Sequence, residues 1–383
     1  MSARLIFVPI VLIVITSLPW LNLSAQDHDA IPASVAETLD LARKALDQGD
    51  CRKAVKTLEN VDMAYSKHHE VLVLKAKAFV QCGEYESASP IIESLRQKVN
   101  EVEFTALIWE WDRLHGRSSE VIASMRAMIE RMGNEAADVL EIAKVRAMAG
   151  QELLQSGQLK EAESEFRAVI GMIDEEHARL HQLDIPHDHA RYFSPDAVVG
   201  IARITQARGD KDKAQRLWRS TRNRLSKPEH LVQAGFAALA AGNTKDADRA
   251  FENVMKKTTG RLKDANMVIA IAIARDESGA MILEKTQACV ARSKDIESQM
   301  HHAYALSLNG RHEEAAKTIA QARRLGTKDS RLDCFSALIH AAAGEKDKAI
   351  DQFESALAKN PAFDPILAAK AKAFLAENRQ KSN

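Results

Sequence analysis

The sequence predicts an all-α fold, a solenoid of stacked helix pairs, on three observations. Glycine recurs at a nearly regular interval along most of the chain, each time between two amphipathic segments. Ala, Leu, Glu, Lys, Gln and Arg are abundant while aromatic residues make up only 5%, as in helices that pack through small and aliphatic side chains. The 383 residues exceed one ordinary core, yet only 16 Gly and 9 Pro are present to link separate domains. A continuous repeat array accounts for all three.

The first expected element is an export signal over residues 1–25. Arg4 precedes an apolar run over residues 5–18, and small residues then lead into a polar stretch, which favours cleavage after Ala25. Because the apolar stretch nearly reaches the length of a spanning helix, an uncleaved membrane anchor stays open as an alternative. Residues 26–33 are expected to form a linker. We therefore expect an exported protein, periplasmic or extracellular, with membrane contact only through this first segment.

The repeat array is expected over residues 34–363. The turn glycines are Gly49, Gly83, Gly116, Gly157, Gly209, Gly242, Gly279, Gly310 and Gly344, with spacings of 34, 33, 41, 52, 33, 37, 31 and 34. A polar residue or two follows most of them before the second amphipathic segment begins. Each unit is therefore a helix, a tight Gly turn and a second helix.

Small residues recur at fixed distances from these turns. An Ala stands five residues after the Gly in seven units, at Ala54, Ala88, Ala162, Ala214, Ala247, Ala315 and Ala349. The residue seven before the Gly is also small in seven units, at Ala42, Ala76, Gly150, Ala202, Gly235, Ala303 and Ala337. The last unit adds Phe353, Ala356 and Pro361 at the next positions of the pattern. In these features the chain resembles the tetratricopeptide repeat family.

Two units depart from this pattern. Gly116 is followed at the Ala position by Val121, and Gly279 is followed there by Glu284, so we expect both units to be degenerate. Beyond the array, residues 364–383 are rich in Ala, Lys and Glu and are expected to form a capping helix with a polar tail. The resemblance implies a right-handed superhelix of about nine helix pairs.

The resemblance also implies where a partner binds, because the first helix of each such repeat lines the concave surface. Carried over to this chain, the groove positions change from charged to apolar along the array. They include Arg43, Lys77, Glu110, Arg113, Gln151, Arg203, Phe236 and Tyr304. A protein or peptide partner is implied, and no cofactor.

Two tryptophans in the third unit allow two interpretations. Trp109 and Trp111 stand two residues apart, so they cannot share one helical face. Either both are buried, one in each seam between helices, or one is exposed as an aromatic anchor for a partner.

The sequence contains no motif that carries a catalytic mechanism. A phosphate-binding Gly loop, GxSxG, HExxH and paired CxxC are all missing, so we expect no enzyme. Basic and acidic residues number 53 each without a basic run, which argues against nucleic-acid binding.

The spacing of 52 points to an insertion at residues 171–196. Its first half is expected to continue a helix, which puts His177 and His181 four residues apart on one face. His187 and His189 follow in a loop, and the four together are a candidate metal site. An exposed loop without a special role and a projection that contacts the partner are the alternatives.

The four cysteines allow one disulfide to be proposed. Cys51 opens the second helix of unit one and Cys82 closes the first helix of unit two, so packing of adjacent units brings both to the same edge. Cys289 and Cys334 are expected to be buried thiols.

Three functions are consistent with these features. The leading hypothesis is an exported scaffold or adaptor that binds a segment of another protein in the concave groove. The second is an enzyme or metal-dependent module that uses the insertion at 171–196. The third is a structural rod in an envelope complex.

Overall fold

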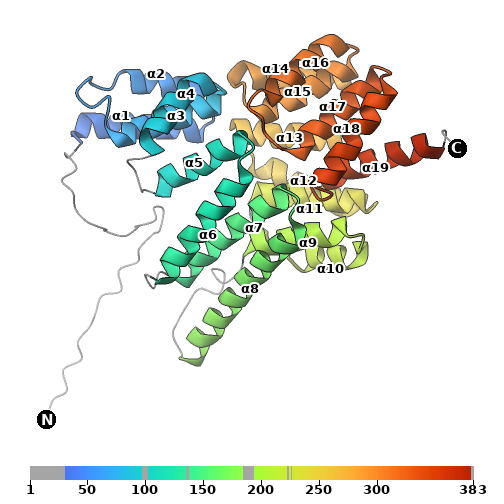
Figure 1. Ribbon diagram of the computed structural model, residues 1–383, viewed down its shortest axis with the longest axis horizontal. Helices are drawn as coiled ribbons and strands as arrows, with labels where there is room; N and C mark the ends of the chain where they lie inside the picture. The colour runs from blue at the N-terminus through green and yellow to red at the C-terminus, as the bar shows by residue number, and fades with distance from the viewer. Residues whose placement is uncertain are drawn as a thin grey trace.

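The protein is all-helical, as expected. In the computed structural model, nineteen helices and no strand occur among the residues that the structure describes, namely 31–96, 102–134, 138–183, 194–221, 224–225 and 227–380 (Figure 1). The expected signal at 1–25 and most of the linker lie outside these ranges. Among the described residues no helix combines the length and apolarity that crossing a bilayer requires.

The helices follow one another as nine antiparallel pairs and a final single helix. Their bounds are α1 Ala33–Asp47, α2 Cys51–Glu59, α3 His69–Cys82, α4 Tyr85–Arg96, α5 Val102–Leu114, α6 Ser118–Asn134, α7 Val139–Gln155, α8 Leu159–Gln182, α9 Pro195–Ala207, α10 Lys211–Thr221, α11 Pro228–Ala240, α12 Thr244–Lys257, α13 Leu262–Ala274, α14 Gly279–Arg292, α15 Ile296–Leu308, α16 His312–Arg323, α17 Ser330–Ala342, α18 Lys346–Lys359 and α19 Pro365–Gln380. We number the pairs units 1 to 9, from α1 and α2 to α17 and α18.

Backbone geometry explains the glycines in eight of the nine turns. The turn residue has a left-handed conformation, for example φ 70° at Gly83, where a residue without Cβ avoids a steric cost. The second helix then begins at a polar cap, as where the Asp50 side chain accepts a hydrogen bond from the amide of Lys53.

Unit 7 differs from the sequence prediction. Gly279 does not form its turn but is the first residue of α14. The left-handed residue is Asp276 with φ 52°, the one non-Gly residue with positive φ in the described ranges. Aspartate tolerates this conformation better than most side chains do. The unit therefore has an ordinary length and an unusual turn residue.

The small residues recur because bulky side chains pack against them. Phe166 of α8 and Phe251 of α12 are fully buried, and their rings occupy the space that a Cβ would need at Gly150 of α7 and Gly235 of α11. The paired helices can therefore approach closely at these points.

Trp109 and Trp111 are both buried, at 3% and 2% exposure. Trp109 packs with Val121 and Met125 toward unit 4, and Trp111 packs with Tyr85 toward unit 2. The prediction that each tryptophan is buried in a different seam between helices is confirmed. The alternative, in which one tryptophan is an exposed anchor for a partner, is wrong.

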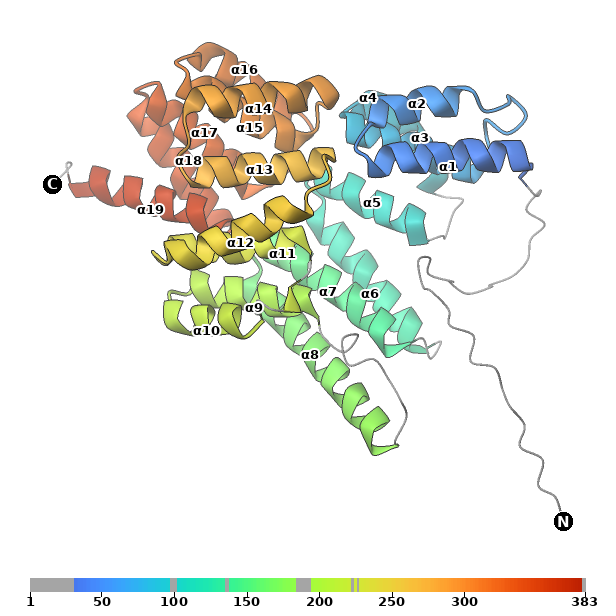
Figure 2. The same cartoon turned by 180° about the vertical axis from the view of Figure 1, so that it is seen from behind.

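The superhelix closes on itself, because the turns of units 1 to 4 contact the loops that flank units 7 to 9. Units 1 and 2 accordingly lie beside α13 and α14 in both views (Figures 1 and 2). Gly49 meets Leu262, Gly83 meets Lys294, Gly116 meets Gly326 and Gly157 meets Lys359. A Cβ at Gly49 would stand 2.5 Å from the Leu262 amide, whereas one at Gly344 would meet nothing within 4 Å.

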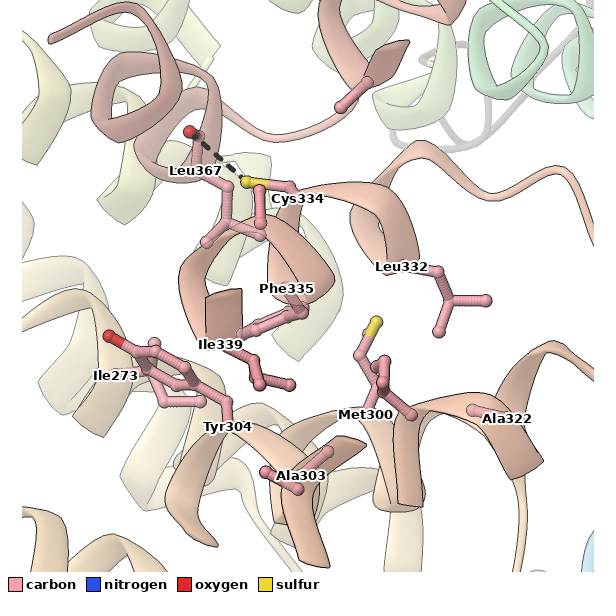
Figure 3. Close-up of a cluster of buried hydrophobic side chains, with 14 of the residues drawn as sticks. Ile273, Met300, Ala303, Tyr304, Ala322, Leu332, Cys334, Phe335, Ile339 and Leu367 are labelled. Carbon is pink, nitrogen blue, oxygen red and sulfur yellow. Dashed lines mark hydrogen bonds between the residues drawn. The ribbon is translucent and has the colours of Figure 1, made fainter. Parts of the chain in front are cut away.

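Helix α19 does more than cap unit 9. Leu367, Ala371 and Leu375 pack into the core of units 8 and 9, where the Cys334 thiol also contacts the Leu367 carbonyl (Figure 3). Ile366 packs instead with residues of α9 and α11 in units 5 and 6, including Phe236. The C-terminal helix thus connects the end of the array to its middle.

Helix α8 projects from the body of the molecule (Figure 1). It runs for 24 residues to Gln182, so the first half of the insertion does continue a helix. Its end carries exposed Leu183. His187 and His189 lie outside the described residues.

Candidate protein-binding groove

The concave side of units 2 and 3 presents two side chains without partners. Lys77 of α3 and Glu110 of α5 hold equivalent positions in adjacent units, and both are exposed. Within the described ranges neither forms an ion pair or a side-chain hydrogen bond. Burial raises the pKa of Glu110, and the nearby charges of Arg113, Lys77 and Lys263 oppose the rise.

The charge of Lys263 reaches this region from a distant part of the array. Lys263 belongs to α13 of unit 7, yet its charge acts on Glu110 of unit 3. Glu110 is therefore accessible to water and still surrounded by protein from both halves of the array. We call the concave region around these charges the lumen, defined by Lys77, Glu110, Arg113 and Lys263.

Three of the predicted groove residues instead brace neighbouring helices. Arg43 of α1 pairs with Glu70 of α3 at 2.9 Å, and Arg113 of α5 pairs with Glu152 of α7 at 2.7 Å. Gln151 of α7 donates to the Asp196 carbonyl of α9 at 3.1 Å. Each contact joins the first helices of consecutive units.

Arg203 holds the chain's own C-terminal segment. Its guanidinium donates to the carbonyls of Ala362 at 2.9 Å and Phe363 at 3.1 Å. Burial lowers the pKa of Arg203 to about 10. Asn360 adds hydrogen bonds from its amide to the Leu154 and Gln155 carbonyls. Residues 360–367 therefore occupy the concave side of units 4 to 6.

The wall formed by units 6 to 9 is apolar with charges at its edge. A cavity of about 180 Å³ lies there, lined at its base by Val232, Phe236, Met267, Met300, Phe335 and Leu367. Ion pairs stand beside it, Lys263 with Glu229 at 2.6 Å and Arg331 with Glu297 at 3.2 Å. Phe236 lines this cavity but is only 4% exposed, so most of its side chain belongs to the core of units 5 and 6.

Tyr304 lies in the core rather than on the groove. It is 8% exposed, and its ring packs 5.4 Å from that of Phe335 (Figure 3). Burial raises the pKa of Tyr304 to about 12. In unit 8 this position turns toward α17 instead of the lumen.

The two candidate metal ligands that the structure describes, His177 and His181, differ in their exposure to solvent. His177 is half-buried and His181 is exposed on α8. Among the described residues, His68, His69 and Glu70 bring three potential metal-ligand atoms close together, and the sequence pattern did not single them out although they are consecutive. Glu70 is already paired with Arg43, and nothing further points to a metal there.

The lumen also contains residues that sequence reasoning did not single out. Glu229, Lys263, Glu297 and Arg331 come from units 6 to 9 and line the cavity of about 180 Å³, and the charge of Lys263 also acts on Glu110 of unit 3. Helical periodicity within one unit does not reveal which distant units meet, so no local signal identified them.

No family model matches the chain, and no curated protein matches it. Several solved structures are similar. Yeast Tom70 has 12% identity over 91% of this chain and 90% of its own, with a TM-score of 0.37. Cut9 in the APC/C hetero-tetramer Cut9-Hcn1 has 16% identity over 90% and 62%, with a TM-score of 0.43. A tetratricopeptide repeat protein of Parabacteroides merdae has 14% identity over 80% and 97%, with a TM-score of 0.36.

The repeat is assigned from the chain itself. Nine helix pairs follow one another, eight of their turns contain a left-handed glycine, and small residues recur at fixed positions beside bulky ones. By these features the chain has the tetratricopeptide-repeat fold.

Proposed function

We propose that this protein is an exported scaffold that binds an extended segment of another protein in its lumen. The observation that carries the proposal is the pair Lys77 and Glu110, two opposite charges in adjacent units without partners among the described residues. A charge enclosed by protein gains most when a ligand of opposite sign pairs with it.

The chemistry of the walls specifies the segment. An acidic side chain would pair with Lys77, and a basic one would pair with Glu110, whose raised pKa reflects the cost of burying its charge. Apolar side chains between them would cover Met267 and Ala270, which are partly exposed in the cavity of the opposite wall. The partner is therefore a mixed-charge segment with apolar residues.

Export is supported by two features. The N-terminal sequence has the charge and apolar pattern of a secretion signal. Cys51 and Cys82 form a disulfide with a Cα separation of 5.5 Å, and such bonds persist in oxidising compartments. The sequence pattern predicts the same cysteine pair from the order of the helices.

Site-specific photo-crosslinking in the native source tests the proposal. A benzophenone amino acid at Met267, which lines the cavity, is expected to capture one partner species in high yield. The matched control places the same group at Met281, which is 42% exposed on α14 outside the cavity, and should not capture it.

A charge swap then tests the pair itself. The double variant K77E/E110K should reduce the Met267 crosslink at least tenfold, because both charges would repel the segment. K160E/E161K makes the same swap on exposed residues of α8 and should leave the crosslink unchanged. An undiminished crosslink in K77E/E110K, or equal capture from Met281, would refute binding in the lumen.

A further inference from the structure

A second hollow lies between units 5 and 6, apart from the lumen. It has a volume of about 130 Å³ and is enclosed by α10, α11 and α12 and the last turn of α9. It shares no lining residue with the cavity of units 6 to 9. We call it the junction cleft.

The cleft exists because small side chains line it. Six alanines contribute to its walls, Ala214, Ala234, Ala237, Ala238, Ala241 and Ala250. The indole of Trp218 completes the apolar surface. An apolar protein cavity of about 150 Å³ holds a benzene molecule, so this space suits an apolar body of similar size.

Two buried polar atoms of lining residues lack a partner in the described portion of the chain, the indole nitrogen of Trp218 and the side-chain oxygen of Gln206. Trp218 is 7% exposed, and its Nε1–H donates to no acceptor in the structure. A buried donor without an acceptor costs roughly as much as a lost hydrogen bond, so such groups in folded proteins usually have a partner.

The rim of the cleft is positive. Lys211, Arg219 and Arg249 line it, and Asp246 is the one acidic residue among the lining side chains. Arg219 approaches Asp246 at 3.7 Å. Lys211 and Arg249 form no ion pair within the described part of the chain, which leaves both guanidinium and ammonium donors for an anion.

We propose that the junction cleft binds a small free carboxylic acid with an apolar body the size of a phenyl ring. The body fills the alanine-lined space against Trp218, and the carboxylate accepts hydrogen bonds from Arg249 and Lys211. The site is independent of the lumen and of the proposed partner.

Ligand-observed NMR on the intact protein tests this with three probes. Phenylacetate should bind saturably, phenylacetamide should bind at least tenfold more weakly, and acetate should not bind in the same range. The amide keeps the shape and removes the charge, and acetate removes the apolar body. Equal affinity for the acid and the amide, or no saturable binding of phenylacetate, would overturn the proposal.

Variants locate the site. R249Q changes an exposed side chain and should weaken phenylacetate about tenfold while leaving the amide unaffected. A250L should fill the cleft and remove binding of both, with the melting temperature measured to verify folding. K77E/E110K should bind phenylacetate as the wild type does, which separates this site from the lumen. Unchanged phenylacetate binding in R249Q would refute the assignment even if A250L failed to fold.

Discussion

The amide of Lys294, in the loop between units 7 and 8, donates a hydrogen bond of 3.0 Å to the carbonyl of Cys82 at the end of α3. The Ser293 hydroxyl donates in the same way to the Gln81 carbonyl. Both carbonyls belong to the last turn of a helix, where no partner within the helix is present. The superhelix therefore closes through a specific contact, in which the loop between units 7 and 8 caps the C-terminal end of α3.

The first prediction separates the two reasons for glycine in the turns. Gly157 and Gly344 have φ of 81° and 79°, so Ala at either position incurs the same left-handed strain of about 1 kcal/mol. At Gly157 the added Cβ also collides with the Lys359 carbonyl, and overpacking costs roughly 1–3 kcal/mol more. Urea unfolding should find G157A less stable than G344A by that margin.

Hydrogen exchange supplies the local readout for this pair. Amides after Lys359 should exchange faster in G157A and stay protected in G344A. Equal stability and equal protection in the two variants would mean that units 4 and 9 are not in contact in solution.

The second prediction concerns Arg203. R203M removes the donors to Ala362 and Phe363, so the segment 360–367 should open more easily by about 1.5–3 kcal/mol. Global stability should change less, because the variant also removes the cost of burying a charge, which the lowered pKa of about 10 records. Limited proteolysis and hydrogen exchange of that segment measure the effect.

The control for Arg203 is R208M. Arg208 pairs with Glu163 at 2.5 Å with its side chain 48% exposed, and exposed pairs contribute less than about 1 kcal/mol. Protection of 360–367 should remain as in the wild type. If R203M left the segment equally protected, the C-terminal loop would be held by its apolar contacts alone.

The repeat period predicted most of the fold because each unit has its own local sequence pattern. Eight of the nine turns, the nine helix pairs and the final helix follow from glycine spacing and helical patterning. Unit 7 was misassigned because Asp276 replaces the expected glycine, although it lies 34 residues after Gly242 and 34 before Gly310. Counting the period would have located it.

The site was less predictable because it depends on contacts between distant units. Lys77 and Glu110 could be placed by their position in the repeat. Nothing local indicates that the charge of Lys263 acts on Glu110, or that Arg203 donates a hydrogen bond to Ala362 rather than to a partner. The curvature of the superhelix determines both of these long-range interactions, and this curvature results from many small packing angles between helices.

The third prediction tests the disulfide. Replacing both cysteines in C51S/C82S should lower stability by about 3 kcal/mol, because the bond closes a segment with a sequence separation of 31. Reductant should lower the melting temperature of the wild type to that of the variant and leave the variant unchanged. A variant that still responded to reductant would implicate Cys289 or Cys334, which are buried as free thiols.

The last prediction is a pH dependence from His301, a buried residue of α15 whose ring packs against Phe335. Burial, with a smaller contribution from Arg331, lowers its pKa from 6.5 to about 3, while Asp295 acts in the opposite direction. Below pH 6.5 the unfolded chain therefore binds a proton that the folded chain does not. Stability contributed by the neutral ring is complete above pH 6.5 and is lost as pH falls toward 3.

Between pH 7.5 and 4.5 the wild type should lose about 2–3 kcal/mol more stability than H301Q, which cannot titrate there. The comparison uses the change with pH, because H301Q loses packing at every pH. H181Q changes an exposed residue of α8 outside the core, and this control variant should follow the wild-type curve. Parallel curves for the wild type and H301Q would mean that His301 is hydrated in solution and that the core of units 8 and 9 is less tightly closed than its packing indicates.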